Sequence, residues 1–174
     1  RLLLDPNRSV NSNTLIVTEA EKVPLSFNQG LSPAVHQSRI ETLHKGYHEV
    51  LNEAICHGIA RGAHLYLSMH SFTPVFDGHQ REVEIGVLFD RYDGLAELAC
   101  QTLGNLGYVS RLNEPYSGLT GELMYAATRH GGECQIPYLE FEVRQDLIDS
   151  AGKRERVTQA LLKTLQALSN KLNI

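Results

Sequence analysis

Apolar side chains recur with the 3.6-residue period of an α-helix in several parts of the chain. The first such segment begins at Ser32 and Pro33, which suit the N-cap and the first turn of a helix. Its pattern continues to about Arg61, and Gly62 is a suitable residue to end it. We predict one helix here, and its length of roughly 28 residues favours a kink near Gly46. Its apolar positions are Val35, Ile40, Leu43, Tyr47, Val50, Leu51, Ala54 and Ile55.

The same period predicts three further helices, and short apolar runs between turn residues predict strands. The helices lie over 94–106, 153–171 and, shorter, 119–128, the last ended by Gly131 and Gly132. The strands lie at 2–4, 15–17, 64–69, 83–89, 108–112 and 136–143. This alternation predicts an α/β fold with a largely parallel, layered sheet. Ligands bind beyond the carboxyl ends of such strands, so the polar residues there are the candidates for chemistry.

Length and composition describe one ordinary globular domain over residues 1–174, with 42% hydrophobic and 21% charged residues. The chain opens at Arg1 inside an apolar run, and we expect the N-terminal part of this domain to be missing. No run of 18 apolar residues is present, which argues against a membrane partner. The net charge of −4 argues against a nucleic-acid partner. Three scattered cysteines, Cys56, Cys100 and Cys134, predict reduced thiols in a cytoplasmic protein.

His70 and Ser71 end a predicted strand, and a histidine at that position suits a metal ligand. A neutral imidazole binds zinc well, and the end of a strand holds the ring rigidly. The alternative is a histidine that only hydrogen-bonds to the backbone. The segment itself leaves both interpretations open.

Glu140 and Glu142 are two residues apart in a predicted strand, so they share one face of it. A carboxylate within an otherwise apolar strand costs free energy unless it is paired or bound to a metal. Glu142 is placed to act as a general base on a metal-bound water, with a pKa tuned by burial. An ion pair with Arg144 at the strand end is an equally good interpretation.

Other polar groups are less specific. Asn7 and Arg8 follow the first apolar run, and an arginine beside an amide suits a carboxylate ligand, although a turn with a solvated arginine fits this segment better. The pair His44 and His48 on the long helix, and the loop pair His79 and Glu82, have spacings that can bind a metal, but such pairs more often lie on a surface or in packing. The motifs of nucleotide sites, serine hydrolases and zincins do not occur.

Four segments in this order resemble the N-formylglutamate amidohydrolase family. They are DPNR (5–8), SMHSFTP (68–74), NEPYSG (113–118) and EFEVRQDLI (140–148). Arg39, Tyr47-His48, Arg81 and Glu84-Ile85-Gly86 add to the resemblance, which spans essentially the whole chain. The family in turn resembles zinc carboxypeptidases and the aspartoacylase group. The resemblance implies a three-layer α/β sandwich with a mixed, largely parallel sheet flanked by helices.

The resemblance also implies a zinc cofactor and roles for the residues of the matching motifs. His70 would be the third zinc ligand, and Glu142 would be the catalytic base that activates the zinc-bound water. Asn7 and Arg8 would hold a carboxylate of the substrate. The two remaining zinc ligands, a histidine and an acidic residue, would lie upstream of Asp5, in the part that we expect to be missing.

Softer assignments complete this interpretation. Arg81 would bind a second carboxylate or polarise the scissile carbonyl, and Tyr116 would line the substrate pocket. Ser71 and Arg144 would support the metal ligand and the base without touching the substrate, and Glu140 would be structural.

The implied reaction is hydrolysis of a small acidic N-acyl amino acid, with N-formyl-L-glutamate giving formate and L-glutamate. One alternative is a carboxypeptidase-like or other N-acyl amino acid hydrolase. Another is a non-catalytic module that binds carboxylates and has lost its metal.

Overall fold

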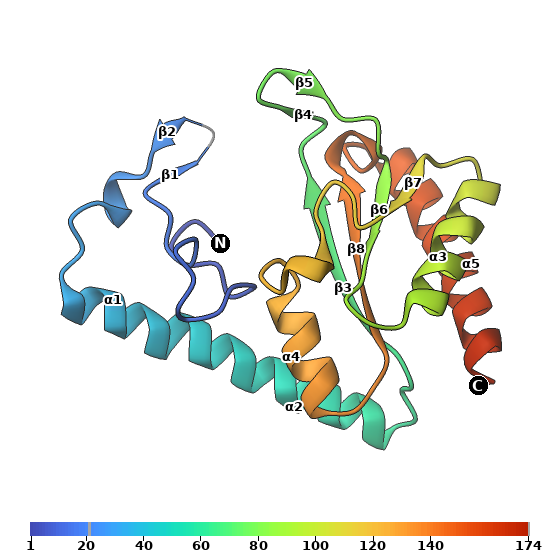
Figure 1. Cartoon of the computed structure of the whole chain (residues 1–174), viewed down its shortest axis with the longest axis horizontal. Helices are drawn as coiled ribbons and strands as arrows, with labels where there is room; N and C mark the ends of the chain where they lie inside the picture. Colours follow the sequence, from blue (N-terminus) through green and yellow to red (C-terminus); the bar gives the residue numbers. More distant parts are fainter. Residues whose placement is uncertain (21, 174) are drawn as a thin grey trace.

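A four-stranded mixed sheet forms the centre of the computed structural model, which describes residues 1–20 and 22–173 (Figure 1). Its strands lie in the order β3 (Tyr66–Phe72), β8 (Tyr138–Arg144), β6 (Ile85–Leu88) and β7 (Ser110–Leu112). β3 pairs with β8, and β6 with β7, in parallel, whereas β6 and β8 are antiparallel. The prediction of an α/β fold with a mixed sheet is confirmed, and four of the predicted strands are present with slightly shifted ends.

The two faces of β8 have opposite character. Leu139, Phe141 and Val143 point into the main core, where they meet helices α3 (Asp93–Asn105) and α5 (Ala151–Leu172). Each buried side chain of this kind contributes about 1.5–3 kcal/mol to stability. The alternate residues, among them Glu140 and Glu142, face the other way, toward helix α4 (Tyr125–Glu133). The apolar face thus stabilises a strand whose second face is polar.

Helix α4 differs from the predicted helix over 119–128, because it begins later and continues through Gly131 and Gly132. Gly131 does not end the helix but allows it to approach β8. A Cβ atom at this position would overlap the ring of Tyr138. The glycine is therefore a packing requirement within the helix.

The long predicted helix is present as α1 (Pro33–Arg39), a π-helical segment η2 (Ile40–Lys45) and α2 (Gly46–Ala60). The Ser32 hydroxyl accepts a hydrogen bond from the Val35 N–H at 3.3 Å, as expected for an N-cap. Gly62, just beyond the helix, has a φ of 91°, which favours glycine. The irregularity predicted near Gly46 is the π-helical segment that precedes it. In Figure 1 the helix passes alongside α4 and extends away from the sheet.

The N-terminal segment corrects two predictions. Residues 2–4 and 15–17 form no strand; instead Leu4 and Leu15 are buried, and the Asp5 N–H donates to the Leu15 carbonyl at 2.8 Å. Leu2 and Leu3 are exposed, so the apolar run reflects one buried position rather than a strand. The strands of this region are the short pair β1 (Glu19–Ala20) and β2 (Val23–Pro24), followed by the 3-10 helix η1 (Ser26–Asn28).

The remaining elements are short. The hairpin β4 (Val75–Phe76) and β5 (His79–Gln80) lies within a predicted loop, and 3-10 helices η3 (Gly118–Thr120) and η4 (Gln145–Leu147) follow β7 and β8. Within the described residues, no helix has the length and apolarity that a bilayer span requires.

Candidate active site

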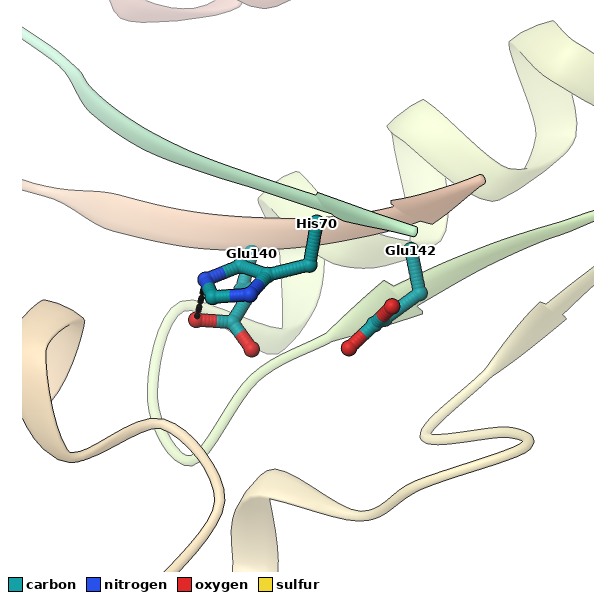
Figure 2. Close-up of side chains that lie close together, drawn as sticks. All are labelled: His70, Glu140 and Glu142. Carbon is teal, nitrogen blue, oxygen red and sulfur yellow. Dashed lines mark ion pairs between the residues drawn. The ribbon is translucent and has the colours of Figure 1, made fainter. Parts of the chain in front are cut away.

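Three ionisable side chains meet on the polar face of the β3–β8 pair. The parallel register places His70 opposite Glu142 and Ser68 opposite Glu140, so all four side chains emerge on one face. One ligand atom from each of His70, Glu140 and Glu142 lies within 4.8 Å of the other two. Figure 2 shows these three residues, which we call the carboxylate cluster. The two residues to which the resemblance assigns the metal ligand and the base, His70 and Glu142, both lie in this cluster.

The His70 ring is held through its Nε2 atom. This nitrogen lies 2.9 Å from the Ser68 hydroxyl and 3.3 Å from Glu140 Oε2, and Figure 2 marks the second contact. Ser68 and Glu140 are both buried, so solvent does not compete for these contacts. The strand end therefore fixes the orientation of the ring, as expected for a metal ligand.

Glu140 is the most buried member of the cluster, with 1% of its surface exposed. Its Oε2 atom also lies 3.4 Å from Asn7 Nδ2. The sequence interpretation treated Glu140 as structural and gave it no part in the site. Its spacing of two residues from Glu142, which puts both on one face of a buried strand, is the signal in the sequence that points to the site.

The Glu142 carboxylate is buried, and its Oε2 atom has no hydrogen-bond partner within the described part of the chain. Burial raises the pKa of Glu142 to about 7, the nearby His70 opposes that rise, and Glu140 adds to it. Gly86 of β6 lies opposite Glu142, and a Cβ atom there would overlap the Glu114 carbonyl. The loop after β7 therefore packs directly beside this carboxylate.

Arg81 lies in a cage of aromatic rings near the end of β3. Its guanidinium carbon is 4.7 Å from the ring centroid of Phe76, 5.2 Å from that of Tyr116 and 5.3 Å from that of Phe72. Its Nη1 atom also donates to the Tyr116 hydroxyl at 3.1 Å. No carboxylate pairs with Arg81 among the described residues. The structure thus brings together Arg81 and Tyr116, both of which were predicted to face a substrate.

Arg144 supports Arg81 rather than Glu142, which corrects the prediction for this residue. Its Nη1 atom donates to three consecutive main-chain carbonyls, those of Arg81 at 2.9 Å, Glu82 at 3.1 Å and Val83 at 3.3 Å. Its other nitrogens pair with Asp146, which keeps the pKa of Arg144 above its usual value. The clamp fixes the segment that presents the Arg81 side chain.

Three further predictions meet a different environment. Ser71 is exposed, and strand alternation places it on the face opposite His70, so it does not support that ring. Both Asn7 amide hydrogens are taken, by the Leu123 carbonyl at 2.7 Å and by Glu140, which leaves no donor for a substrate carboxylate. Arg8 donates to the Asn7 carbonyl at 2.8 Å and lies 3.6 Å from Asp5. The loop pair His79 and Glu82 is exposed and outside the carboxylate cluster.

A second group of buried imidazoles, His44, His48 and His130, lies beside α4; we call it the histidine cluster. His44 Nε2 is 2.8 Å from the Arg8 carbonyl, and His48 Nε2 is 3.0 Å from the Pro6 carbonyl. His48 Nδ1 meets His130 Nε2 at 2.8 Å. Burial and the neighbouring His44 lower the pKa of His48 to about 4, and burial also lowers that of His130. These rings anchor the turn at residues 5–8, in agreement with a packing role for His44 and His48.

The carboxylate cluster fits a divalent metal ion. The His70 imidazole is a donor that zinc accepts, and the two carboxyl groups beside it suit the surroundings of a cation. The unpartnered Oε2 of Glu142 is an acceptor that the protein itself does not satisfy. A metal ion or a metal-associated water near His70 would satisfy it.

Comparison with known proteins identifies the family of the chain and structures of similar fold. A family model described as N-formylglutamate amidohydrolase matches residues 1–149. The structure of a gene product from Agrobacterium tumefaciens is similar at a TM-score of 0.82 and 28% identity, over 99% of this chain and 68% of that one. The N-formylglutamate amidohydrolase from Ralstonia eutropha is similar in fold, at a TM-score of 0.69 and 18% identity, over 99% of this chain and 74% of that one. No curated protein matches the chain.

Proposed function

Because the chain belongs to the N-formylglutamate amidohydrolase family, we propose that it provides the site of a zinc-dependent hydrolase of N-acyl amino acids, with N-formyl-L-glutamate as substrate. The observation that supports this best is the carboxylate cluster. It places a buried carboxylate of raised pKa beside an oriented imidazole. That pairing is what hydrolysis of an unactivated amide by a metal and a general base requires.

His70 would hold the zinc ion, together with ligands that the family resemblance places upstream of Asp5. Zinc, when bound, supplies Lewis acidity for the formyl carbonyl and makes water a better nucleophile at neutral pH. Glu142 takes the proton of the attacking water on Oε2 and delivers it to the leaving amine nitrogen. A pKa of about 7 suits both halves of this transfer, because the carboxyl gains and loses a proton easily near neutrality.

Arg81 supplies the charge that an acidic substrate needs. Its guanidinium has aromatic rings and a hydroxyl around it, so its charge remains available to a carboxylate. Tyr116 orients this guanidinium through its hydroxyl and would contact the substrate beside it. Arg8 remains a second candidate for a carboxylate of the substrate. The three cysteines are free thiols, which supports our proposal of a cytoplasmic protein.

Formate release from N-formyl-L-glutamate tests the proposal. We would measure it with added zinc and with a chelator. Chelator-sensitive release supports the zinc hydrolase. Release that a chelator does not change removes zinc from the reaction.

A failure to release formate has two readings that substrate binding separates. Isothermal titration with N-formyl-L-glutamate in the presence of chelator detects a carboxylate site without any chemistry. Binding without turnover favours the non-catalytic module. Turnover of other N-acyl amino acids, but not of N-formyl-L-glutamate, favours a related hydrolase with a different substrate.

A further inference from the structure

Asn7, Glu140 and His70 form a continuous chain of polar contacts that begins at helix α4 and ends at the candidate metal ligand. Asn7 Oδ1 accepts the Ala126 N–H at 2.9 Å, which fixes the orientation of the amide. Its Nδ2 atom must then face the Leu123 carbonyl and Glu140 Oε2, as observed. Glu140 Oε2 also lies 3.3 Å from His70 Nε2.

The contact with Glu140 favours one position for the His70 proton. A lone pair on Nε2 would face the lone pairs of Glu140 Oε2 across 3.3 Å, so the neutral form with hydrogen on Nε2 is favoured. In a neutral imidazole the other nitrogen, Nδ1, then has the free lone pair. Nδ1 has no hydrogen-bond partner among the described residues, and Figure 2 shows it on the side of the ring toward Glu142.

We propose that Glu140, held in place by Asn7, is a positioning residue that fixes the Nε2–H form of His70 and directs Nδ1 to the metal. This inference deepens the proposed function, since it assumes that His70 binds a metal there. A carboxylate behind a metal-binding imidazole orients the ring and raises its basicity. The arrangement gives a physical reason for an almost fully buried carboxyl group on an apolar strand. It also gives Asn7 a role that differs from substrate binding.

Ser68 is the competing explanation, because its hydroxyl also lies within hydrogen-bond distance of His70 Nε2. A hydroxyl both donates and accepts, so Ser68 is compatible with either tautomer. Glu140 favours only one. The two residues therefore predict different consequences when each is removed.

The test reads the tautomer directly, without metal and without activity. The ¹⁵N chemical shifts of His70 in ¹⁵N-histidine-labelled protein, at about pH 8 where an ordinary imidazole is neutral, report which nitrogen bears hydrogen. We expect Nε2–H in the wild-type chain and in Ser68→Ala. We expect a mixture of both tautomers in Glu140→Leu. Glu140→Gln keeps one acceptor oxygen and should restore the wild-type pattern if the leucine variant folds poorly. Glu97→Leu, at an exposed site on α3, is the matched control.

Zinc affinity gives the second readout. A carboxylate behind a ligand typically changes metal affinity about 10- to 100-fold, so Glu140→Leu should weaken zinc binding by that factor while Ser68→Ala should not. An Nδ1–H tautomer in the wild type overturns the proposal. A Glu140→Leu protein that keeps the wild-type tautomer also overturns it. If that variant keeps the tautomer but loses zinc, Glu140 is a direct ligand instead. Absence of formate release with the expected tautomers rejects N-formyl-L-glutamate as the substrate and leaves this assignment in place.

Discussion

The carboxylate cluster and the histidine cluster both contain buried imidazoles, but their partners differ. His70 faces a carboxylate through one nitrogen and leaves the other unengaged. His48 is hydrogen-bonded through both nitrogens, to the Pro6 carbonyl and to His130. Burial alone therefore does not identify a functional histidine. A free ring nitrogen alone does not identify one either, because His130 Nδ1 also has no partner among the described residues. What distinguishes His70 is the pair of carboxylates beside it.

The most severe test of the carboxylate cluster removes its base. Glu142→Gln keeps the size and polarity of the side chain but cannot take a proton. Turnover should fall about 10²- to 10⁴-fold, the usual contribution of general acid–base catalysis, with zinc content unchanged. Single-turnover kinetics and metal analysis measure the two quantities, and Glu97→Gln is the control. Near-wild-type turnover would remove Glu142 from the mechanism.

Arg81→Met tests whether the caged guanidinium binds a substrate carboxylate. Loss of one charge-assisted hydrogen bond, worth roughly 1.5–3 kcal/mol, should raise KM about 10- to 100-fold with little change in kcat. Comparison of N-formyl-L-glutamate with N-formyl-L-glutamine shows whether the side-chain carboxylate is the one bound. The exposed Arg91 provides the control variant Arg91→Met. An unchanged KM for both substrates would assign the cage a purely structural role.

Arg144→Met should raise KM less, by roughly 3- to 10-fold, because Arg144 acts only by holding the segment that bears Arg81. The double variant Arg81→Met/Arg144→Met should then be no worse than Arg81→Met alone. Steady-state kinetics of the four proteins forms the cycle, with Arg156→Met as the surface control. Additive effects would show that Arg144 acts elsewhere.

The sequence predicted the main sheet and the long helices because their signals are local. Ser32 and Pro33 mark a helix start, and the apolar residues of β8 mark a buried strand. The same local reasoning failed at residues 2–4. There Leu4 is buried while the two preceding residues, Leu2 and Leu3, are exposed, and an apolar run of three residues does not distinguish this from a strand.

The residues of the candidate site were predictable only where the pattern of their own strand marks them. Glu142 and His70 each end or interrupt an apolar strand, which is visible in the sequence. The partners of Asn7 and Arg144 are not visible in the sequence. Asn7 contacts Glu140, 133 positions away, and Arg144 contacts the Arg81 carbonyl, 63 positions away. Ser71 was misplaced because neighbouring strand residues point to opposite faces.

The pH dependence of stability in metal-free protein also distinguishes the two clusters, with the smallest effect of these tests. Burial lowers the pKa of His48 from 6.5 to about 4, so between these values the unfolded chain binds a proton that the folded chain does not. This contribution to stability is complete above pH 6.5 and is lost as the pH falls toward 4. Glu142 has the opposite sign. Its pKa rises from 4.5 to about 7, so its contribution is complete below pH 4.5 and is lost as the pH rises through 7.

The two contributions oppose each other between about pH 4.5 and 6.5, and each variant should expose the other group. His48→Gln retains an amide donor for the Pro6 carbonyl and removes the titration, so its Tm should fall less on acidification than that of the wild type. Glu142→Gln should show the reverse, with a steeper fall of several degrees, since about 1 kcal/mol changes Tm by roughly 2–4 °C in a chain of this size. Thermal melting followed by circular dichroism in chelator gives both slopes, and His57→Gln, at an exposed site on α2, should match the wild type. Equal slopes in the two test variants would mean that neither pKa is shifted as described. Burial lowers the pKa of an imidazole and raises that of a carboxyl group only where the group is withdrawn from water.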